Sequence, residues 1–463
     1  MVQAVREQIE ELRTGMSGPI VLPGDSEYDA RRQVFNAEID RRPSAIARCT
    51  STSDVVAAIN FAREHDLEIS VRGGAHSMAG TAVCDDGLMI DLSLLNEINV
   101  DVPAQRAHVS GGALLGSVDA ATQAHGLAAP FGLVSHTGVG GLTLGGGMGW
   151  LTRKFGLSVD NLLAAEVVTA DGQVLQATDH PDLLWAIRGG GGNFGIATSF
   201  DFQLHEVNPM VHFGMFFWGL DQGPAALRLA RDIVEAMPPD VNAVFGGLNA
   251  PPAPFVPEQH RLAPGYVLML TGFGSEQEHA QIVDQIRMRL QPLFELVTPM
   301  PYVQLQQLLD EGFAFGSYGY EKGTYVEDVT DDVIKVVTER VPMRKSPLSA
   351  MLFYRLDAEF SRVSEDETAF SGGRSPRYTI FTIGYAPEPE LLRADREWVR
   401  NVWDALRPYA IGGGDGYLNG TADYKNDRVR GSYGDAKYER LAKIKGKYDP
   451  ENVFHNNANI QPS

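Results

Sequence analysis

The first two hundred residues alternate between short aliphatic runs and longer amphipathic stretches. Runs rich in β-branched residues are expected strands, and stretches with apolar positions three and four residues apart are expected helices. The strands fall at 45–48, 67–72, 88–92 and 165–170, and the helices at 53–65 and 116–125. This alternation is typical of an α/β region.

The pattern changes after residue 206. Prolines cluster between residues 251 and 257, strand-like apolar runs recur, and acidic amphipathic stretches lie between them. The expected strands are 211–219, 266–272, 351–354 and 378–385, and the expected helices are 276–293 and 331–340. This pattern predicts a second domain of the α+β class, with an antiparallel sheet covered by helices.

The C-terminal tail resembles the first region in its compact, motif-like residue pattern. Tyr438, Leu441 and Ile444 lie at helical spacing within residues 433–448, and Asp449-Pro450-Glu451 ends the pattern. We therefore expect the tail to pack back against the first domain.

The chain has 463 residues, enough for two large domains. The predicted division is a discontinuous first domain of residues 1–206 and 409–463 and a second domain of residues 207–408.

Composition narrows the function. Asp and Glu outnumber Lys and Arg by 59 to 39, and the net charge of −20 disfavours nucleic acid and anionic membranes as partners. Two cysteines, Cys49 and Cys84, do not make a disulfide framework or a metal site, and we expect ordinary buried thiols. With neither a signal-peptide pattern nor an apolar run of membrane-spanning length, the expected protein is soluble and cytoplasmic.

Glycine is in surplus, with 49 residues, and it concentrates in patches. The segment 137–150 (TGVGGLTLGGGMGW) holds seven glycines and no charged residue. A backbone that wraps a diphosphate and a flat ring needs such positions, whereas a plain loop is the alternative. In a second patch, 71–80 (VRGGAHSMAG), an expected strand ends in two glycines and a short loop presents His76.

Residues 190–195 (GGGNFG) match the G-x-G-x-x-G pattern of dinucleotide-binding folds. That motif needs a helix directly after the glycines, because the helix N-terminus faces the phosphates. Here an alternating, strand-like run follows at 196–204, so we interpret the glycines as a turn.

Several longer segments resemble, in order, the FAD-binding domain of the vanillyl-alcohol oxidase superfamily, in its berberine-bridge-enzyme-like branch of FAD-linked oxidases. They are RRPSAIARCTSTSDVVAAINFARE, VRGGAHSMAG, LMIDLSLLNEINVD, TGVGGLTLGGGMGWLTRKFGLSVDNLLAAEVVTADG, DLLWAIRGGGGNFGIATSF and, in the tail, YLNG and YERLAKIKGKYDPENVFHNNANI. The resemblance implies an α+β protein, in which a PCMH-type FAD-binding domain of two α/β subdomains accompanies a substrate domain with an antiparallel sheet.

The resemblance also implies site residues. His76 matches the histidine that the family joins covalently to the flavin 8α-methyl carbon. Tyr417 and Asn419 match a Y-x-N element beside the flavin, with Tyr417 the candidate to hydrogen-bond or deprotonate the substrate, and Thr137 lies where relatives tune oxygen access. The expected FAD contacts are Arg72, Gly73, Gly74, Ala75, His76, Ser77, Met78, Gly80, Thr137, Gly138, Gly141, Leu142, Gly145, Gly147, Gly195, Ile196, Tyr417, Asn419 and Asn456.

This chain departs from the family pattern at several positions. Val134 replaces a cysteine that forms a second flavin bond in many relatives, so we expect attachment through His76 only. Ala75 replaces a glycine of many relatives, and Met148 replaces an active-site tyrosine of plant relatives. The run 377–386, where other members carry a catalytic carboxylate, contains none.

The predicted protein is an FAD oxidase that takes a hydride from a small organic substrate onto flavin N5 and reduces O2 to H2O2. The aromatic runs 213–218, 313–320 and 351–354 either pack in the core or line an apolar pocket. In the second case a phenolic, polyketide, alkaloid, amine or alcohol fits better than a free sugar. A dehydrogenase with another acceptor, a carbohydrate oxidase and a flavin-binding protein without turnover stay open, as do the substrate and the oligomeric state.

Overall fold

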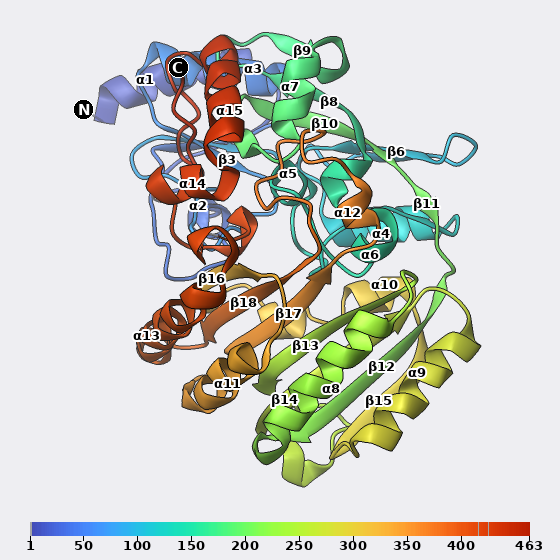
Figure 1. The fold of residues 1–463 in the computed structure, drawn as a ribbon. Coiled ribbons are helices and arrows are strands. Elements are labelled where there is room, and N and C mark those ends of the chain that lie inside the picture. The colour runs from blue at the N-terminus through green and yellow to red at the C-terminus, as the bar shows by residue number, and fades with distance from the viewer. Residues whose placement is uncertain (1, 415, 425) are drawn as a thin grey trace.

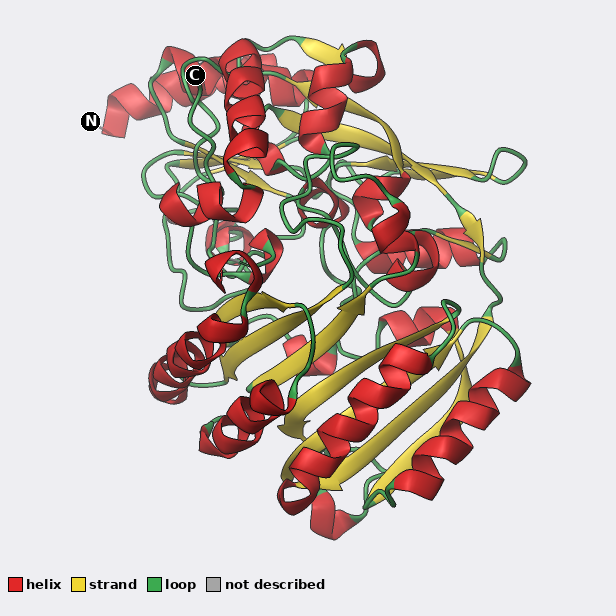
Figure 2. Cartoon of the chain, viewed as in Figure 1, coloured by secondary structure: helices red, strands yellow, loops and turns green. Residues whose placement is uncertain are grey.

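The computed structural model describes residues 2–414, 416–424 and 426–463. Its described residues form a four-stranded, a five-stranded, a two-stranded and a seven-stranded sheet, with helices packed on them (Figures 1 and 2). The predicted α+β class is confirmed.

The four-stranded sheet has the order β1-β2-β4-β3. Its strands are β1 (Ile20–Val21), β2 (Ala45–Arg48), β3 (Ile69–Arg72) and β4 (Leu88–Asp91). β4 lies between β2 and β3 and pairs in parallel with both, and the helix α3 (Thr52–Glu64) forms the crossover from β2 to β3. Ser51 caps α3 by accepting a hydrogen bond from the backbone of Asp54. The N-terminal helix α1 (Val2–Gly15) contacts α3.

The five-stranded sheet has the order β5-β6-β10-β8-β9 and is antiparallel throughout. Its strands are β5 (Ile98–Asp101), β6 (Arg106–Ser110), β8 (Leu162–Val168), β9 (Val174–Gln176) and β10 (Ile196–Gln203). β10 begins directly after the glycine run 190–195, so the strand predicted there is confirmed. The helices near this sheet include α4 (Leu115–Gln123) and α7 (Pro181–Ile187).

The C-terminal tail forms two helices, α14 (Asn426–Tyr433) and α15 (Asp435–Tyr448), where the sequence predicted one over 433–448. Gly434 separates them with a φ of 73°, a backbone conformation that favours glycine. Leu441 and Ile444 of α15 belong to the same buried cluster as Phe200 of β10. The tail thus returns to the first region, as a discontinuous domain requires, while the exact domain boundaries stay a prediction.

The seven-stranded sheet is antiparallel, with the order β15-β12-β14-β13-β17-β18-β16. Its strands are β12 (Met210–Gly219), β13 (Val241–Asn249), β14 (Pro264–Gly272), β15 (Phe294–Pro301), β16 (Tyr318–Val326), β17 (Ala350–Leu356) and β18 (Arg377–Ala386). The helices α8 (Gly223–Ala236), α9 (Glu276–Arg289), α11 (Asp331–Arg340) and α13 (Pro389–Leu406) lie along one face (Figure 1). Smaller elements complete the chain: α2 (Tyr28–Arg32), α5 (Val139–Leu144), α6 (Thr152–Phe155), α10 (Tyr302–Gln306), α12 (Glu359–Arg362), β7 (Leu127–Ala128) and β11 (His205–Glu206).

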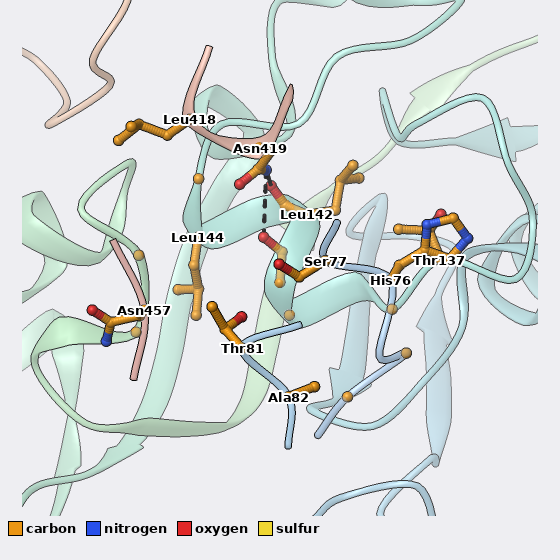
Figure 3. A pocket seen from close by; sticks show the side chains of 18 of the residues that line it. His76, Ser77, Thr81, Ala82, Thr137, Leu142, Leu144, Leu418, Asn419 and Asn457 are labelled. Atoms are coloured by element: carbon orange, nitrogen blue, oxygen red, sulfur yellow. Dashed lines mark hydrogen bonds between the residues drawn. The ribbon is translucent and has the colours of Figure 1, made fainter. Parts of the chain in front are cut away.

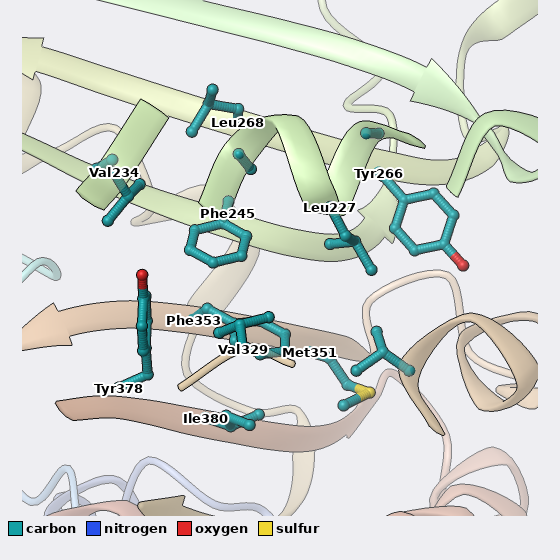
Figure 4. Close-up of a cluster of buried hydrophobic side chains, with 14 of the residues drawn as sticks. Leu227, Val234, Phe245, Tyr266, Leu268, Val329, Met351, Phe353, Tyr378 and Ile380 are labelled. Atoms are coloured by element: carbon teal, nitrogen blue, oxygen red, sulfur yellow. The ribbon is translucent and has the colours of Figure 1, made fainter. Parts of the chain in front are cut away.

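Each face of this large sheet is buried. Figure 4 shows Leu227 and Val234 of α8 over the strands, with the rings of Phe245 and Phe353 stacked at 4.9 Å between centroids. The other face contacts the first region through a cluster that includes Met78, Trp150, Leu352 and Ile383. The sheet therefore forms one wall of the space between the two parts of the chain. Within the described residues, no helix is long and apolar enough to cross a bilayer.

Candidate functional site

A cavity of about 420 Å³ lies between the first region, the seven-stranded sheet and the C-terminal tail. The loop after β3 contributes His76 and the glycine-rich segment contributes Thr137, which lie together in Figure 3. Asn419 and Asn457 of the tail also reach this space (Figure 3). The cavity therefore brings together segments that are far apart in the sequence.

The loop that presents His76 packs backbone against backbone on the glycine-rich segment. A Cβ added at Gly74 would lie only 2.1 Å from the backbone nitrogen of Gly138, so neither loop could approach as closely with a side chain at this point. The next residue, Ala75, has a φ of 54°, which glycine adopts without strain and alanine does not. Because Ala75 stands where many relatives carry glycine, a residue with a strained backbone directly precedes His76.

His76 is half-buried and held by two aromatic neighbours. The ring of Phe35 stacks on its imidazole at 3.9 Å between centroids, and Nε2 of His76 lies 2.9 Å from Nδ1 of His136. Loss of water around the ring, and then the nearby His136, lower the pKa of His76 to about 3. The imidazole is therefore neutral at pH 7 and keeps a nitrogen lone pair, the form that acts as a nucleophile.

Tyr417 and Asn419 form one hydrogen-bonded unit with the glycine-rich segment. The hydroxyl oxygen of Tyr417 accepts hydrogen bonds from the backbone N–H of Gly147 at 2.8 Å and from Nδ2 of Asn419 at 3.0 Å. Asn419 Nδ2 also donates to the carbonyl of Leu142 at 3.0 Å. Burial raises the pKa of Tyr417 well above its ordinary value. Its phenol therefore stays protonated near pH 7, which suits hydrogen bonding to a ligand and disfavours a role as base.

The structure adds a cavity residue that the sequence analysis missed. Glu321 of β16 lines the cavity and is buried, and burial raises the pKa of its carboxyl to about 8. The sequence carried a signal, because a glutamate lies among the tyrosines and glycines of the strand YGYEKGTYV. The expected position of a carboxylate was the run 377–386, whose strand β18 pairs directly with β16 and places Ile383 opposite Glu321.

Most of the predicted contact residues line the cavity. These are Gly73, Gly74, Ala75, His76, Ser77, Met78, Thr137, Gly138, Gly141, Leu142, Gly145, Gly195, Ile196, Tyr417, Asn419 and Asn456. Arg72, Gly80 and Gly147 lie outside this lining. The guanidinium of Arg72 donates to the carbonyls of Arg31 and Gln33, while Gly80 packs against Ile39. The roles of all these residues toward FAD stay predictions.

The aromatic runs divide between core and cavity. Residues 213–218 contribute Phe213, Phe216 and Trp218 to the buried clusters and none to the cavity lining. Phe313 and Tyr354, from the other two runs, do line the cavity. The packing interpretation therefore holds for the whole first run, whereas the other two runs divide between the core, which takes Tyr320 and Phe353, and the cavity.

The positions that depart from the family pattern also lie at the cavity. Val134 and Met148 both line it.

Cys49 and Cys84 are buried elsewhere, and burial raises the pKa of both thiols, so each is unreactive. The cavity lining therefore offers no thiol among the described residues.

The cavity is lined by many glycines and by amide side chains, with no Lys or Arg among its described lining residues. This α+β protein is therefore of a class that can bind a small molecule through backbone and amide groups. The comparisons with known proteins give this class its family. The chain belongs to the berberine-bridge-enzyme-like FAD-linked oxidoreductases, as the sequence resemblance implied. A family described as an FAD binding domain matches residues 43–178, and one described as berberine and berberine like matches residues 416–461.

Similarity to individual relatives extends over nearly the whole chain. An FAD-linked oxidoreductase of Dictyostelium discoideum is 30% identical over 98% of this chain and 97% of its own length. The (R)-6-hydroxynicotine oxidase of Paenarthrobacter nicotinovorans is 29% identical over 96% of this chain and 97% of its own. The crystal structure of 6-hydroxy-D-nicotine oxidase from Arthrobacter nicotinovorans superposes with a TM-score of 0.85 at 27% identity, covering 97% of this chain and 98% of that one.

The residues present fit FAD, the cofactor of this family. A Cβ added at Gly141 or Gly192 would meet no atom within 4 Å, so both glycines leave open space, and both line the cavity. Asn457 also lines the cavity, and its buried Oδ1 has no hydrogen-bond partner among the described residues. Backbone N–H groups and such amides would hold the cofactor, because no cationic side chain of the described lining can hold its diphosphate.

Proposed function

We propose that this chain is an FAD oxidase that removes a hydride from a small organic substrate and passes the electrons to O2, forming H2O2, with FAD attached through His76 alone. FAD supplies the hydride acceptor. The chain's own residues hold the donor carbon, exclude water and take a proton.

The observation that carries the attachment is the neutral, positioned imidazole of His76 on the cavity wall. Its contacts with Phe35 and His136 fix the ring, which lowers the cost of holding it against an electrophilic carbon. Val134 supports the single attachment, because an isopropyl group cannot form a thioether.

Acid precipitation of the purified protein tests this attachment. We expect the flavin to stay with the precipitate of the wild type and to appear in the supernatant for His76→Ala. His125→Ala, an exposed histidine outside the cavity, is the control. We further expect Val134→Cys in the His76→Ala background to restore covalent flavin. A yellow His76→Ala precipitate would assign the bond to another residue.

Two observations support an oxidase. Thr137 lines the cavity with a small, half-buried side chain, which leaves room for O2. Two relatives bear oxidase names: the (R)-6-hydroxynicotine oxidase above and a tetrahydroberberine oxidase of Berberis wilsoniae, which is 27% identical over 98% of this chain. Photoreduced protein mixed with air should reoxidise quickly, and Thr137→Leu should slow this step. Slow reoxidation of the wild type would favour a dehydrogenase.

The lining on the sheet side favours a flat or apolar substrate. Leu352, Tyr354, Phe381 and Ile383 present aliphatic and aromatic surface there. Anaerobic bleaching of the flavin across sugars, phenols, amines, alkaloids and alcohols separates the candidate classes. Bleaching by sugars alone would favour a carbohydrate oxidase, and no bleaching by any class would favour a binding protein without turnover.

A further inference from the structure

Glu321 is the one carboxylate among the described residues that line the cavity. Its neighbours Tyr320 and Lys322 lie on the other face of β16, where both bond Asp423 at 2.9 Å. Gly319 and Gly323 share the face of Glu321.

The neighbours of these two glycines show which segments flank Glu321. A Cβ at Gly319 would lie 2.6 Å from the sulfur of Met78, and one at Gly323 would lie 3.4 Å from the backbone nitrogen of Tyr417. Glu321 therefore lies between the loop that carries His76 and the segment that carries Tyr417.

The Glu321 carboxyl lacks a compensating charge. Among the described residues no side chain is within hydrogen-bond or ion-pair distance of it, and the nearest cation along the chain, Lys322, is turned away and paired with Asp423. Desolvation alone accounts for its raised pKa of about 8. An ionised carboxylate in this position is costly until a ligand brings a positive charge.

The other titratable groups on the cavity wall do not change charge between pH 5 and about pH 10. The imidazole of His76 has a pKa lowered to about 3, and burial raises the pKa of every tyrosine on the wall above its ordinary value. These tyrosines are Tyr354, Tyr417, Tyr424 and Tyr433. The pKa of Tyr424 is about 12, because burial raises it, interaction with the Ser77 hydroxyl lowers it, and the Glu321 carboxylate raises it further. A pH dependence of ligand binding in this range therefore reports on Glu321 and on the ligand.

We propose that Glu321 binds the ammonium group of an amine substrate and removes its proton before the adjacent carbon is oxidised. An ammonium nitrogen has no lone pair, so a hydride cannot leave from the neighbouring carbon until one N–H bond breaks. In this step that N–H bond breaks, an O–H bond forms on Glu321, and the lone pair stays on nitrogen. The hydrogen of the C–H bond would then leave with both electrons as a hydride to FAD, the oxidant of the proposed function, while the nitrogen lone pair forms the C=N bond of the product. This inference rests on that function.

The test compares a cation with a neutral molecule of similar shape. The probes are N-methylbenzylamine and benzyl methyl ether, titrated anaerobically into flavin-loaded wild type, Glu321→Gln and Glu327→Gln, with the visible flavin spectrum as readout. Glu327 is an exposed glutamate just beyond β16, so its variant loses the same charge outside the cavity. We expect Glu321→Gln to weaken amine binding by about 10-fold or more, with ether binding changed by less than about 3-fold. Glu327→Gln should match the wild type.

The wild type alone gives a second measurement, which does not depend on how a variant folds. Because Glu321 must be ionised and a benzylic amine is still mostly protonated at pH 9, amine binding should tighten nearly tenfold from pH 7 to pH 9, whereas ether binding should not. Equal weakening of both probes in Glu321→Gln, unchanged amine binding, or no amine binding to the wild type would overturn the proposal. Acid precipitation and reoxidation in air do not involve Glu321, so failure of the proposed oxidase is seen separately.

Discussion

The open space at Gly141 gives a sharp test of whether FAD binds in the glycine-lined cavity. Gly141 lies within the short helix α5, has no positive φ, and would place a Cβ where no atom lies within 4 Å. Gly141→Ala therefore adds one methyl group that the protein alone accommodates. We expect the same methyl group to obstruct FAD, because Gly141 lines the cavity.

Two opposing effects follow from this geometry. Alanine is favoured over glycine inside a helix by about 1 kcal/mol, so the cofactor-free variant should be as stable as its parent or slightly more so. A methyl group forced into an occupied space typically costs about 1–3 kcal/mol, which weakens binding by roughly 5-fold to 150-fold. Stability and affinity should thus move in opposite directions.

The assay uses the His76→Ala background, in which we expect flavin to exchange freely. FAD is titrated into cofactor-free protein and followed by quenching of flavin fluorescence, and thermal unfolding is recorded without FAD. Gly312→Ala is the control, since a Cβ at Gly312 also meets no atom within 4 Å but the residue does not line the cavity. FAD affinity of Gly141→Ala within about twofold of its parent would refute the reasoning.

Three further predictions concern groups around the cavity. Lys445→Met should lower the stability by about 3–5 kcal/mol, because it leaves the fully buried Asp449, 2.6 Å from Lys445 Nζ, without its cation, and thermal unfolding measures the loss. His136→Ala should slow covalent attachment of FAD to His76, since the 2.9 Å contact that orients the ring is lost, and covalent flavin is followed with time after FAD is mixed with cofactor-free protein. Burial raises the pKa of Asp119 to about 7, above its value near 4 in the unfolded chain. Between these two values the native state keeps a proton that the unfolded state releases, so the free energy of unfolding falls from about pH 4 to pH 7. Asp119→Asn cannot ionise, and its melting temperature should exceed that of the wild type by more at pH 8 than at pH 5.

For each of these three predictions, one result would contradict the reasoning. Lys447→Met removes an exposed ion pair with Asp182 and should change stability by less than about 1 kcal/mol, so equal effects of the two lysine variants would contradict the role given to burial. An attachment rate unchanged in His136→Ala would show that the histidine pair does not orient His76. A constant melting difference for Asp119→Asn across pH would mean that Asp119 titrates normally.

Much of the fold follows from local patterns. The strand predicted at 45–48 and the helix predicted at 331–340 agree with β2 and α11 residue by residue. The helix has apolar residues at helical spacing and a capping Thr330, whereas the strand is a short, largely apolar run that is buried at every position. The break between α14 and α15 was not predicted, although Gly434 lies inside the expected helix. A glycine in a helical pattern is tolerated in many proteins, so its effect depends on the packing that surrounds it.

The residues of the candidate site could be predicted from local sequence patterns only in part. His76, Tyr417 and Asn419 could be found because they belong to local motifs, and they line the cavity. Glu321 belongs to no motif, and its position depends on which strand lies at the edge of the seven-stranded sheet. The contact between Nε2 of His76 and Nδ1 of His136 joins residues 60 positions apart. Strand order and loop contacts of this kind arise from tertiary packing, which periodicity does not encode.

Charge acts at two scales in this protein, over the whole surface and inside the cavity, and both favour the cationic substrate proposed above. A net charge of −20 produces a field that attracts cations to the surface and repels carboxylates. Inside, the described lining of the cavity has no Lys or Arg, so the negative diphosphate of FAD would depend on backbone N–H groups, which would be a use for the glycine surplus. Glu321 adds a further negative charge when ionised. An anionic substrate would meet no Lys or Arg among the described lining residues, whereas an ammonium ion would, in the role proposed for Glu321, relieve the uncompensated carboxylate and then deliver its proton to it.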